Sequence, residues 1–171
     1  MAMERRNEIL KAITDRPGTT FRELARELGL GIGDLQYHLR KLEKEGKVFS
    51  RKIGRRRYLF PKGFEETAQR LLIAISTETR RRILLLLIER PKNQKEIAKS
   101  LGLSQPTVSY HMDELLKLGV VTAEKESRSV VYTLSHDPEL VARLIKDYRP
   151  SLWEKLADNL IDLLTSVGDG E

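Results

Sequence analysis

One stretch of this sequence occurs twice, and this repeat constrains the fold more than any other feature. Residues 20–48 align with residues 93–121 at a constant offset of 73, without a gap. Both copies carry a Gly-Leu pair, then a Tyr-His pair, then a single Gly at matching positions. An internal repeat this regular predicts two similar units in tandem. Each unit is near the lower size limit for a self-sufficient hydrophobic core, so we expect it to pack against a neighbour.

The second copy predicts a helix, a tight turn and another helix. Asn93 and Glu96 have the spacing of a capping box at the start of the first helix. Gly102 ends that helix, because Gly adopts left-handed backbone angles without a Cβ clash. Ser104 caps the next helix, with Pro106 in its first turn. Two short helices joined by a Gly-containing turn are the helix-turn-helix pattern, whose second helix can enter a DNA major groove.

The rest of the chain predicts a mostly α fold with small β wings. In residues 1–63, three helices and a two-stranded hairpin around Gly54 predict an N-terminal winged-helix domain. Residues 64–134 predict a second winged-helix domain with an extra helix at its start. Residues 135–171 predict C-terminal helices for packing or dimerisation. The apolar run at 83–88 is expected to be buried on most sides.

The net charge of +6 is distributed unevenly. Residues 1–63 hold 16 Lys and Arg against 8 Asp and Glu, a net of +8. Residues 64–134 hold 11 against 9, and residues 135–171 hold 4 against 8. This gradient predicts that a polyanion binds mainly to the N-terminal domain.

Cysteine is absent from the sequence, which excludes disulfides and thiolate metal sites. The charged N-terminal residues lack the apolar core of a signal peptide, and the longest apolar runs are far too short to span a membrane. We therefore expect a cytoplasmic protein that does not cross a membrane.

The second helix of the first repeat, about 32–45, is expected to read DNA. On a helical wheel, its cations lie opposite the apolar stripe, and a groove lined by phosphates favours them. The following wing is also basic, and wing tips commonly contact phosphates or the minor groove. The predicted DNA-binding residues are Gln36, Tyr37, Arg40, Lys41, Lys44, Arg51, Lys52, Arg55, Arg56 and Arg57. The alternative is that the wing is only a solvated basic hairpin.

The second helix of the second repeat has a different outer face, on which the wheel places Tyr110, Asp113, Glu114 and Lys117. Paired carboxylates oppose entry into a groove lined by phosphates. The N-terminal end of this helix still carries neutral groups able to contact phosphates or base edges. The candidates there are Gln105, Thr107, Ser109 and Tyr110. The alternative is that this helix only packs against protein.

His38 and His111 lie at the edges of the two buried stripes. They belong to separate domains and have no acidic or cysteine partners at ligand spacing, so they are expected to pack or to contact phosphate. The sequence also lacks a nucleophile motif, a Gly-rich phosphate loop and a paired-carboxylate site. We therefore expect no enzymatic activity, no cofactor and no metal.

The last predicted helix carries an apolar seam at alternating spacings of three and four residues. Its members are Trp153, Leu156, Leu160, Leu163 and Val167. The seam covers barely two heptads, which is short for an independent coiled coil. The helix could fold back on its own domain, form a dimer or bind a partner, and we favour a homodimer.

Residues 76–134 resemble the ArsR-type winged-helix transcriptional regulators. The resemblance rests on a Thr-Arg-Arg-Arg-Ile helix start, on SQPTVSYHM and on the Glu-Leu-Leu-x-x-Gly-Val-Val exit into a wing. The whole chain resembles the two-headed winged-helix regulators of archaea. The family implies DNA binding and often a helix-mediated dimer. Many members sense metals through cysteines in the helix equivalent to 94–101, and this sequence has none to carry that role.

The leading hypothesis is therefore a sequence-specific, double-stranded DNA-binding transcriptional regulator. The rival is a tandem winged-helix docking module of a chromosome-organising or basal transcription complex. RNA binding is a third option, because a basic wing cannot distinguish the two nucleic acids. Salt-dependent retention on DNA would separate the first two.

Overall fold

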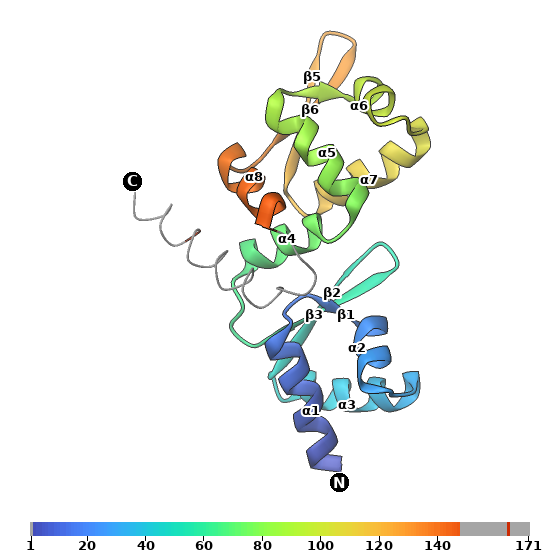
Figure 1. Ribbon diagram of the computed structural model, residues 1–171, viewed down its shortest axis with the longest axis vertical. Coiled ribbons are helices and arrows are strands. Elements are labelled where there is room, and N and C mark those ends of the chain that lie inside the picture. Colours follow the sequence, from blue (N-terminus) through green and yellow to red (C-terminus); the bar gives the residue numbers. More distant parts are fainter. Residues whose placement is uncertain (1, 148–163, 165–171) are drawn as a thin grey trace.

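The computed structural model describes residues 2–147 and Leu164 of the chain. Two units follow one another along the long axis of the molecule (Figure 1). The first unit contains α1 (Ala2–Asp15), β1 (Thr19–Thr20), α2 (Phe21–Leu28), α3 (Ile32–Lys44), β2 (Val48–Ile53) and β3 (Arg56–Pro61). The second unit contains α4 (Glu66–Ile75), α5 (Glu78–Glu89), β4 (Lys92–Asn93), α6 (Gln94–Leu101), α7 (Gln105–Lys117), β5 (Val121–Glu126), β6 (Ser129–Leu134) and α8 (Pro138–Asp147). The predicted fold class, mostly α with small β wings in two tandem winged helix-turn-helix units, is confirmed.

The same local interactions begin and end the first helix of each helix-turn-helix. The Thr20 hydroxyl accepts a hydrogen bond from the Glu23 backbone N–H at 3.2 Å, and the Asn93 side chain accepts one from Glu96 at 2.8 Å. Both capping boxes are complete, because each Glu side chain also accepts from the backbone N–H of its cap residue. Gly29 then ends α2 with a φ of 63°, in the left-handed region that glycine adopts at low cost.

Each unit carries a three-stranded antiparallel sheet. The strand order is β1-β3-β2 in the first unit and β4-β6-β5 in the second. The long hairpin of each sheet forms the wing: β2–β3 is the first wing and β5–β6 is the second. In Figure 1 the first wing extends from its own unit toward α7 of the second.

The first wing lies between two hydrophobic cores. Successive side chains of a strand point to opposite faces of the sheet. Leu59 of β3 packs into the core of the first unit, whereas Tyr58 and Phe60 belong to the core of the second unit together with α4. The small first unit therefore covers the outer face of its sheet with the second unit, as expected for a domain of this size.

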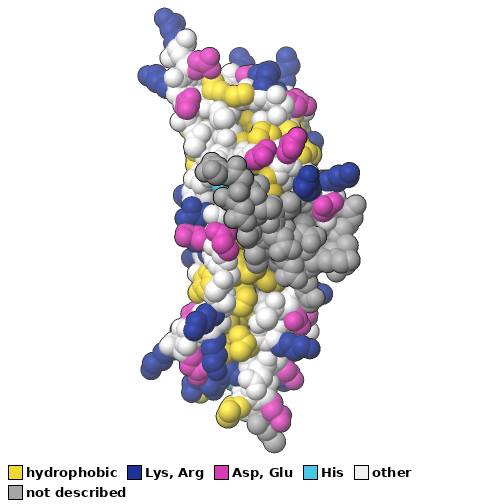
Figure 2. All heavy atoms as spheres, turned by 90° about the vertical axis from the view of Figure 1, so that its left-hand side faces the viewer, with side chains coloured by type: hydrophobic (Ala, Val, Ile, Leu, Met, Phe, Trp, Pro, Cys, Tyr) yellow, Lys and Arg dark blue, Asp and Glu magenta, His cyan; other side chains and the backbone are white. Residues whose placement is uncertain are grey.

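The apolar run on α5 is less buried than its composition suggests. Ile83, Leu84 and Leu87 are buried, but Leu85 is 46% exposed. The prediction that residues 83–88 are buried on most sides is therefore wrong only at Leu85, because α4, α6, α7, α8 and β6 pack around the rest of the run. Figure 2, which views the left side of Figure 1, shows apolar, acidic and basic side chains interspersed over the described part of that face.

The predicted dimerisation residues Trp153, Leu156, Leu160, Leu163 and Val167 lie outside the described residues. Leu164 is described, and it packs against the core of the second unit. Within the described ranges, none of the helices combines the length and apolarity that a membrane crossing requires.

Candidate nucleic-acid interface

The first recognition helix, α3, buries one face and exposes a basic one. Leu35, His38 and Leu39 are buried against the core, and Arg40 and Lys44 are exposed. Tyr37 is 52% exposed, as its position on the wheel predicted. The Lys41 ammonium lies 4.9 Å from the centre of the Tyr37 ring. A hydrogen bond with Lys41, followed by the charge of the same residue, lowers the pKa of the Tyr37 phenol.

Two of the predicted wing cations hold the structure together. Arg57 donates hydrogen bonds to Gln36 Oε1 and to Glu43 Oε1, both at 2.7 Å, and its guanidinium lies over the Phe21 ring. Arg51 donates to Glu66 Oε1 at 3.2 Å. Arg57, which pairs with Lys52 near the tip of the hairpin, therefore fixes the outer part of the first wing to α2 and α3, and Arg51 fixes the wing to α4.

The remaining wing cations are available for a ligand. Lys52, Arg55 and Arg56 are exposed, and within the described part of the chain they have no carboxylate partner. They differ in this respect from Arg51 and Arg57, although the five cations are neighbours in the sequence.

A groove of about 600 Å³ lies between α2, the start of α3 and the first wing. We call it the basic groove, and its lining is Thr20, Phe21, Arg22, Glu23, Arg26, Ile32, Gln36, Arg55, Arg56 and Arg57. Five arginines face one carboxylate there, and Glu23 is already engaged in the capping box. This concave, positively charged surface is suited to an anionic ligand.

Sequence reasoning missed two of these arginines. Arg22 and Arg26 are four residues apart, so they lie on the same exposed side of α2. The signal was present, because Leu24 and Leu28 mark the opposite side as the core face. The prediction followed the recognition helix and the wing, and it gave α2 no part in binding.

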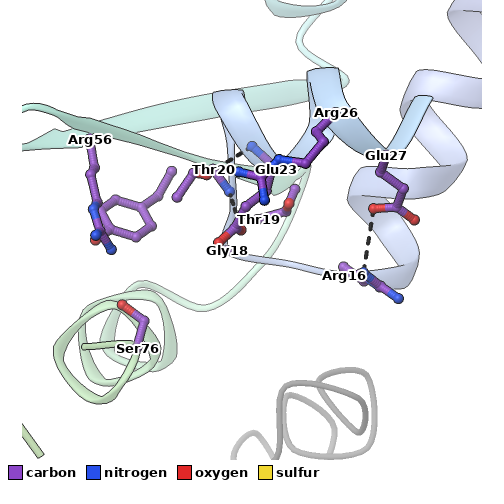
Figure 3. A pocket seen from close by; sticks show the side chains of 10 residues that line it. Arg16, Gly18, Thr19, Thr20, Glu23, Arg26, Glu27, Arg56 and Ser76 are labelled. Atoms are coloured by element: carbon purple, nitrogen blue, oxygen red, sulfur yellow. Dashed lines mark hydrogen bonds and ion pairs between the residues drawn. The ribbon is translucent and has the colours of Figure 1, made fainter. Parts of the chain in front are cut away.

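A second cavity of about 320 Å³ adjoins the basic groove, and the two share Thr20, Glu23, Arg26 and Arg56. It extends toward Ser76 of the second unit (Figure 3). On its far side Arg16 pairs with Glu27 at 3.4 Å. Among the residues that line this cavity, the arginines without a carboxylate partner are Arg26 and Arg56, which it shares with the basic groove.

The second recognition helix, α7, presents a different surface. Gln105 and Thr107 are exposed, Ser109 is half-buried and Tyr110 is 53% exposed. The neutral candidates at its N-terminal end are therefore largely accessible.

Glu114 corrects the prediction of an acidic outer face on α7. It is only 5% exposed, and its carboxylate accepts a hydrogen bond from Arg80 of α5 at 2.6 Å. Arg80 is 2% exposed and also donates to the Tyr58 hydroxyl of β3 at 3.3 Å. We call Arg80, Glu114 and Tyr58 the junction cluster. The wheel placed Glu114 outside because it could not include the first wing, which covers that side of α7.

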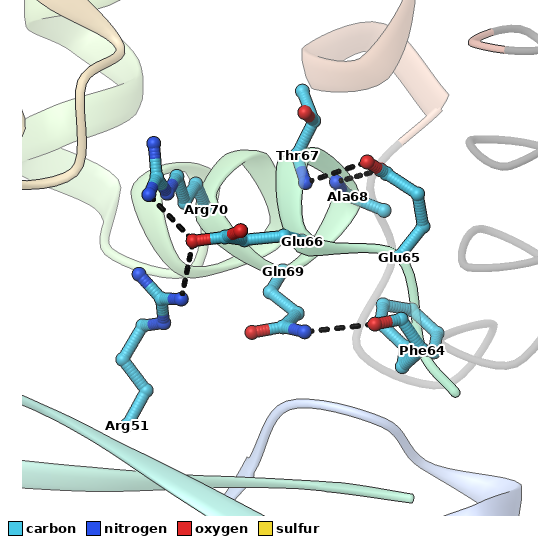
Figure 4. Close-up of polar contacts among 8 residues, drawn as sticks. All are labelled: Arg51, Phe64, Glu65, Glu66, Thr67, Ala68, Gln69 and Arg70. Carbon is cyan, nitrogen blue, oxygen red and sulfur yellow. Dashed lines mark hydrogen bonds and ion pairs between the residues drawn. The ribbon is translucent and has the colours of Figure 1, made fainter. Parts of the chain in front are cut away.

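Polar contacts on α4 complete the junction (Figure 4). Glu66 accepts from Arg51 of the first wing and from Arg70 of its own helix, the latter at 2.6 Å. These arginines, first through the Arg51 hydrogen bond, lower the pKa of the Glu66 carboxyl. Glu65 caps the same helix by accepting from the backbone of Thr67 and Ala68.

The two histidines are packed beside the recognition tyrosines. His38 and His111 each make an edge-on ring contact with the preceding Tyr, at 5.3 and 5.2 Å. Burial, followed by the charge of Arg80, lowers the pKa of His111, which favours its neutral form. Within the described residues, neither histidine belongs to a group of three or more potential metal ligands.

Comparisons with known proteins agree with this architecture. A family model described as an N-terminal HTH domain matches residues 3–72, and one described as bacterial regulatory protein, arsR family, matches residues 77–123. The HTH-type transcriptional regulator NmtR from Mycobacterium tuberculosis is 34% identical over 83 residues, which cover 47% of this chain and 69% of NmtR. This chain belongs to the ArsR family of helix-turn-helix regulatory proteins. The resemblance predicted from residues 76–134 is confirmed.

An archaeal relative of this ArsR-family chain matches more of its length. An HTH-type transcriptional regulator from Methanocaldococcus jannaschii is 35% identical over 130 residues, covering 76% of this chain and 33% of the relative. Among solved structures, HlyU from Vibrio cholerae is 33% identical, with a TM-score of 0.44, over 48% of this chain and 91% of its own. The chain spans between 33% and 60% of the length of three curated relatives, the archaeal one included.

Proposed function

We propose that this protein is a sequence-specific, double-stranded DNA-binding transcriptional regulator that acts in the cytoplasm. The observation that carries the proposal is the basic groove beside the exposed face of α3. Arg22, Arg26, Arg55 and Arg56 line it, and among the described residues none of them has a carboxylate partner. DNA supplies the closely spaced negative charges that such a surface neutralises.

The proposed roles follow from position. The exposed face of α3 enters the major groove, where Tyr37 and Arg40 contact base edges. Lys41 and Lys44, at the C-terminal half of the helix, contact phosphates, as do Lys52 and the four arginines of the basic groove. Arg51, Arg57 and Gln36 act indirectly, because their polar groups are engaged in holding the wing.

Salt-dependent DNA binding tests this function. A duplex is first selected from random sequence by the full chain, and its affinity is then measured at several salt concentrations. Arg55→Ala with Arg56→Ala is expected to weaken binding to all sequences and to reduce the slope of log K against log salt by about 2, since each phosphate contact contributes about 0.9.

Arg82→Ala with Arg143→Ala is the matched control. It removes the same charge from positions on α5 and α8, away from the groove. If both double variants change the affinity and the slope equally, the groove does not bind the DNA backbone. Arg57 stays unchanged in this test because it holds the wing.

The docking-module alternative loses support from the position of Glu114. That alternative was based on an acidic outer face of α7. Glu114 is buried in the junction cluster, so of the two predicted carboxylates only Asp113 is exposed. We therefore propose DNA rather than a protein partner as the ligand of the basic surface.

We further propose a homodimer as the working form, with the seam from Trp153 to Val167 as its interface. Exposed Leu85 on α5 adds an apolar position to the second unit. Trp153→Ala with Leu160→Ala is expected to produce monomers that bind a half-site normally and a full site poorly. A wild-type monomer in light scattering at micromolar concentration, with and without DNA, contradicts this assembly.

A further inference from the structure

The first wing ends against the second recognition helix. Gly54, at the tip of the wing, lies so close to α7 that a Cβ atom built on it would overlap the Glu114 carboxylate. The same Cβ would lie 3.0 Å from the Tyr110 hydroxyl oxygen, closer than van der Waals contact allows. Backbone of the first unit therefore packs directly on the side of α7.

The second wing shows why this position is a glycine. Its equivalent residue, 73 positions later, is Ser127, which has a φ of 55° where Gly54 has 61°. Serine adopts the turn in the second wing, so the backbone conformation alone does not require glycine. Both residues are exposed, but Gly54 has the Glu114 and Tyr110 side chains beside the point where a Cβ atom would be added. A side chain at the first tip would overlap α7, so the absence of a Cβ atom at Gly54 allows the close contact between the wing and α7.

The outer part of the same wing is also attached to the other recognition helix. Arg57 joins the start of β3 to Gln36 and Glu43 of α3. One register pair further from the tip, Tyr58 meets Arg80 and Arg51 meets Glu66. One hairpin thus connects α3 to α7 and sets the distance between them. In Figure 1, α2, the first wing and α7 lie on the right-hand side of the molecule.

The first wing also brings positive charge to a helix that has little of its own. The exposed start of α7 is neutral, and its own wing places Lys125 and Arg128 among Glu124 and Glu126. The pKa of Tyr110 is raised mainly by its hydrogen bond with Glu114, and the opposing charges that act on it are those of Arg80 and Arg55. Arg55 of the first wing is therefore a near cation for α7.

We propose that α3, the first wing and the N-terminal end of α7 form one continuous face, on which a single DNA duplex contacts both helix-turn-helix units of one chain. The proposal rests on the proposed function. The wing contacts the backbone between two segments of the duplex, α3 reads one segment, and Gln105 and Thr107 of α7 contact the other. Helices that enter successive major grooves on one side of DNA contact segments about 10 bp apart.

Hydroxyl-radical footprinting on the selected duplex tests this arrangement with the full chain. Tyr37→Ala is expected to weaken protection of one segment, and Gln105→Ala with Thr107→Ala that of another, about 10 bp away in the same half-site. Gly54→Ser introduces the residue of the second wing and displaces the tip from α7. This variant is expected to weaken protection of only the DNA segment that α7 contacts. It is also expected to reduce the affinity for the selected duplex by up to roughly 100-fold, the gain that joining two binding sites contributes.

Gly46→Ser is the matched control, because Gly46 also has a positive φ of 71° but nothing lies within 4 Å of the point where a Cβ atom would be added. The inference is overturned if Gly54→Ser and Gly46→Ser give the same footprint and affinity, or if the Gln105 and Thr107 variant leaves the footprint unchanged. The latter variant keeps the wing intact, so it decides the question even if Gly54→Ser unfolds. Failure of the wild-type chain to bind any selected duplex would instead refute the proposed function.

Discussion

The two recognition helices share a scaffold but differ in the residue that follows each tyrosine by four positions. In α3, Tyr37 is followed by Lys41, which lies over its ring. In α7, Tyr110 is followed by Glu114, which is buried. In the helix that precedes each helix-turn-helix, an arginine lies three residues before a buried isoleucine: Arg6 before Ile9 in α1, and Arg80 before Ile83 in α5. One charge reversal on α7 thus changes the partner available to that arginine.

The consequence of this difference is a division of roles. Arg6 cannot pair with Lys41, and it forms a long contact of 3.6 Å with exposed Glu45. Arg80 pairs with Glu114 and reaches Tyr58, so the equivalent position in the second unit becomes part of the junction. The two copies of the recognition helix therefore keep the same structure, although the position that is exposed as Lys41 in α3 is buried as Glu114 in α7, where it forms a contact at the junction of the units.

The largest expected difference between the units is in stability. Arg80→Ala leaves the Glu114 carboxylate buried without its partner, which is expected to lower the free energy of unfolding by about 3–5 kcal/mol. Arg6→Ala removes a partly exposed pair and is expected to cost about 1 kcal/mol or less. Urea denaturation followed by circular dichroism measures both. Equal losses would show that the buried cluster contributes no more than a surface pair.

A smaller difference is expected in base discrimination. If α3 is the main reader, Tyr37→Ala or Arg40→Ala reduces the preference for the selected sequence over random DNA by about 1–3 kcal/mol. Tyr110→Ala is the matched variant on α7, and we expect a smaller loss because Tyr110 faces Glu114 and the wing tip. Competition binding with selected and random duplexes measures the preference. A larger loss for Tyr110→Ala would reverse the assignment of the main reader.

The smallest expected effect is on tyrosine ionisation. Lys41 lowers the pKa of Tyr37, and Glu114 raises that of Tyr110. As pH rises, Tyr37 therefore ionises first; its ionisation favours the folded state above the ordinary pKa, whereas that of Tyr110 opposes it. Ultraviolet titrations of Tyr37→Phe and Tyr110→Phe, each subtracted from wild type, give the two curves. Coincident curves would show that the two environments are electrostatically alike.

Much of the fold could be predicted from local signals. The capping residues Thr20 and Asn93, the helix-ending Gly29 and Gly102, and the offset of 73 placed the helices, turns and wings. The capping and helix-ending interactions involve residues only a few positions apart, so they can be predicted without knowledge of the tertiary packing. The exposure of Tyr37 and Tyr110 followed from helical periodicity in the same way.

The candidate site was only partly predictable. The sequence gives no reason to separate the four arginines of the first wing. In the structure, Arg55 and Arg56 line the basic groove without a carboxylate partner among the described residues. Arg51 pairs with Glu66, and Arg57 pairs with Glu43. Arg22 and Arg26 join the groove from α2, where helical spacing marks them as exposed but does not show that the first wing lies beside them. Such pairings depend on residues that meet only after the wing has folded against its neighbours.

The sequence by itself determined two winged helix-turn-helix units, the faces of their helices and the concentration of positive charge in the first. Periodicity, capping and turn chemistry are local, and the repeat made each signal visible twice. Only the tertiary structure decided that the first wing serves both units, that Glu114 turns inward to Arg80, and that Gly54 meets a limit of space in addition to its positive φ. These features depend on β3, which contributes side chains to both hydrophobic cores. The alternation along β3 predicts two opposite faces, but the sequence does not show which core each face will contact.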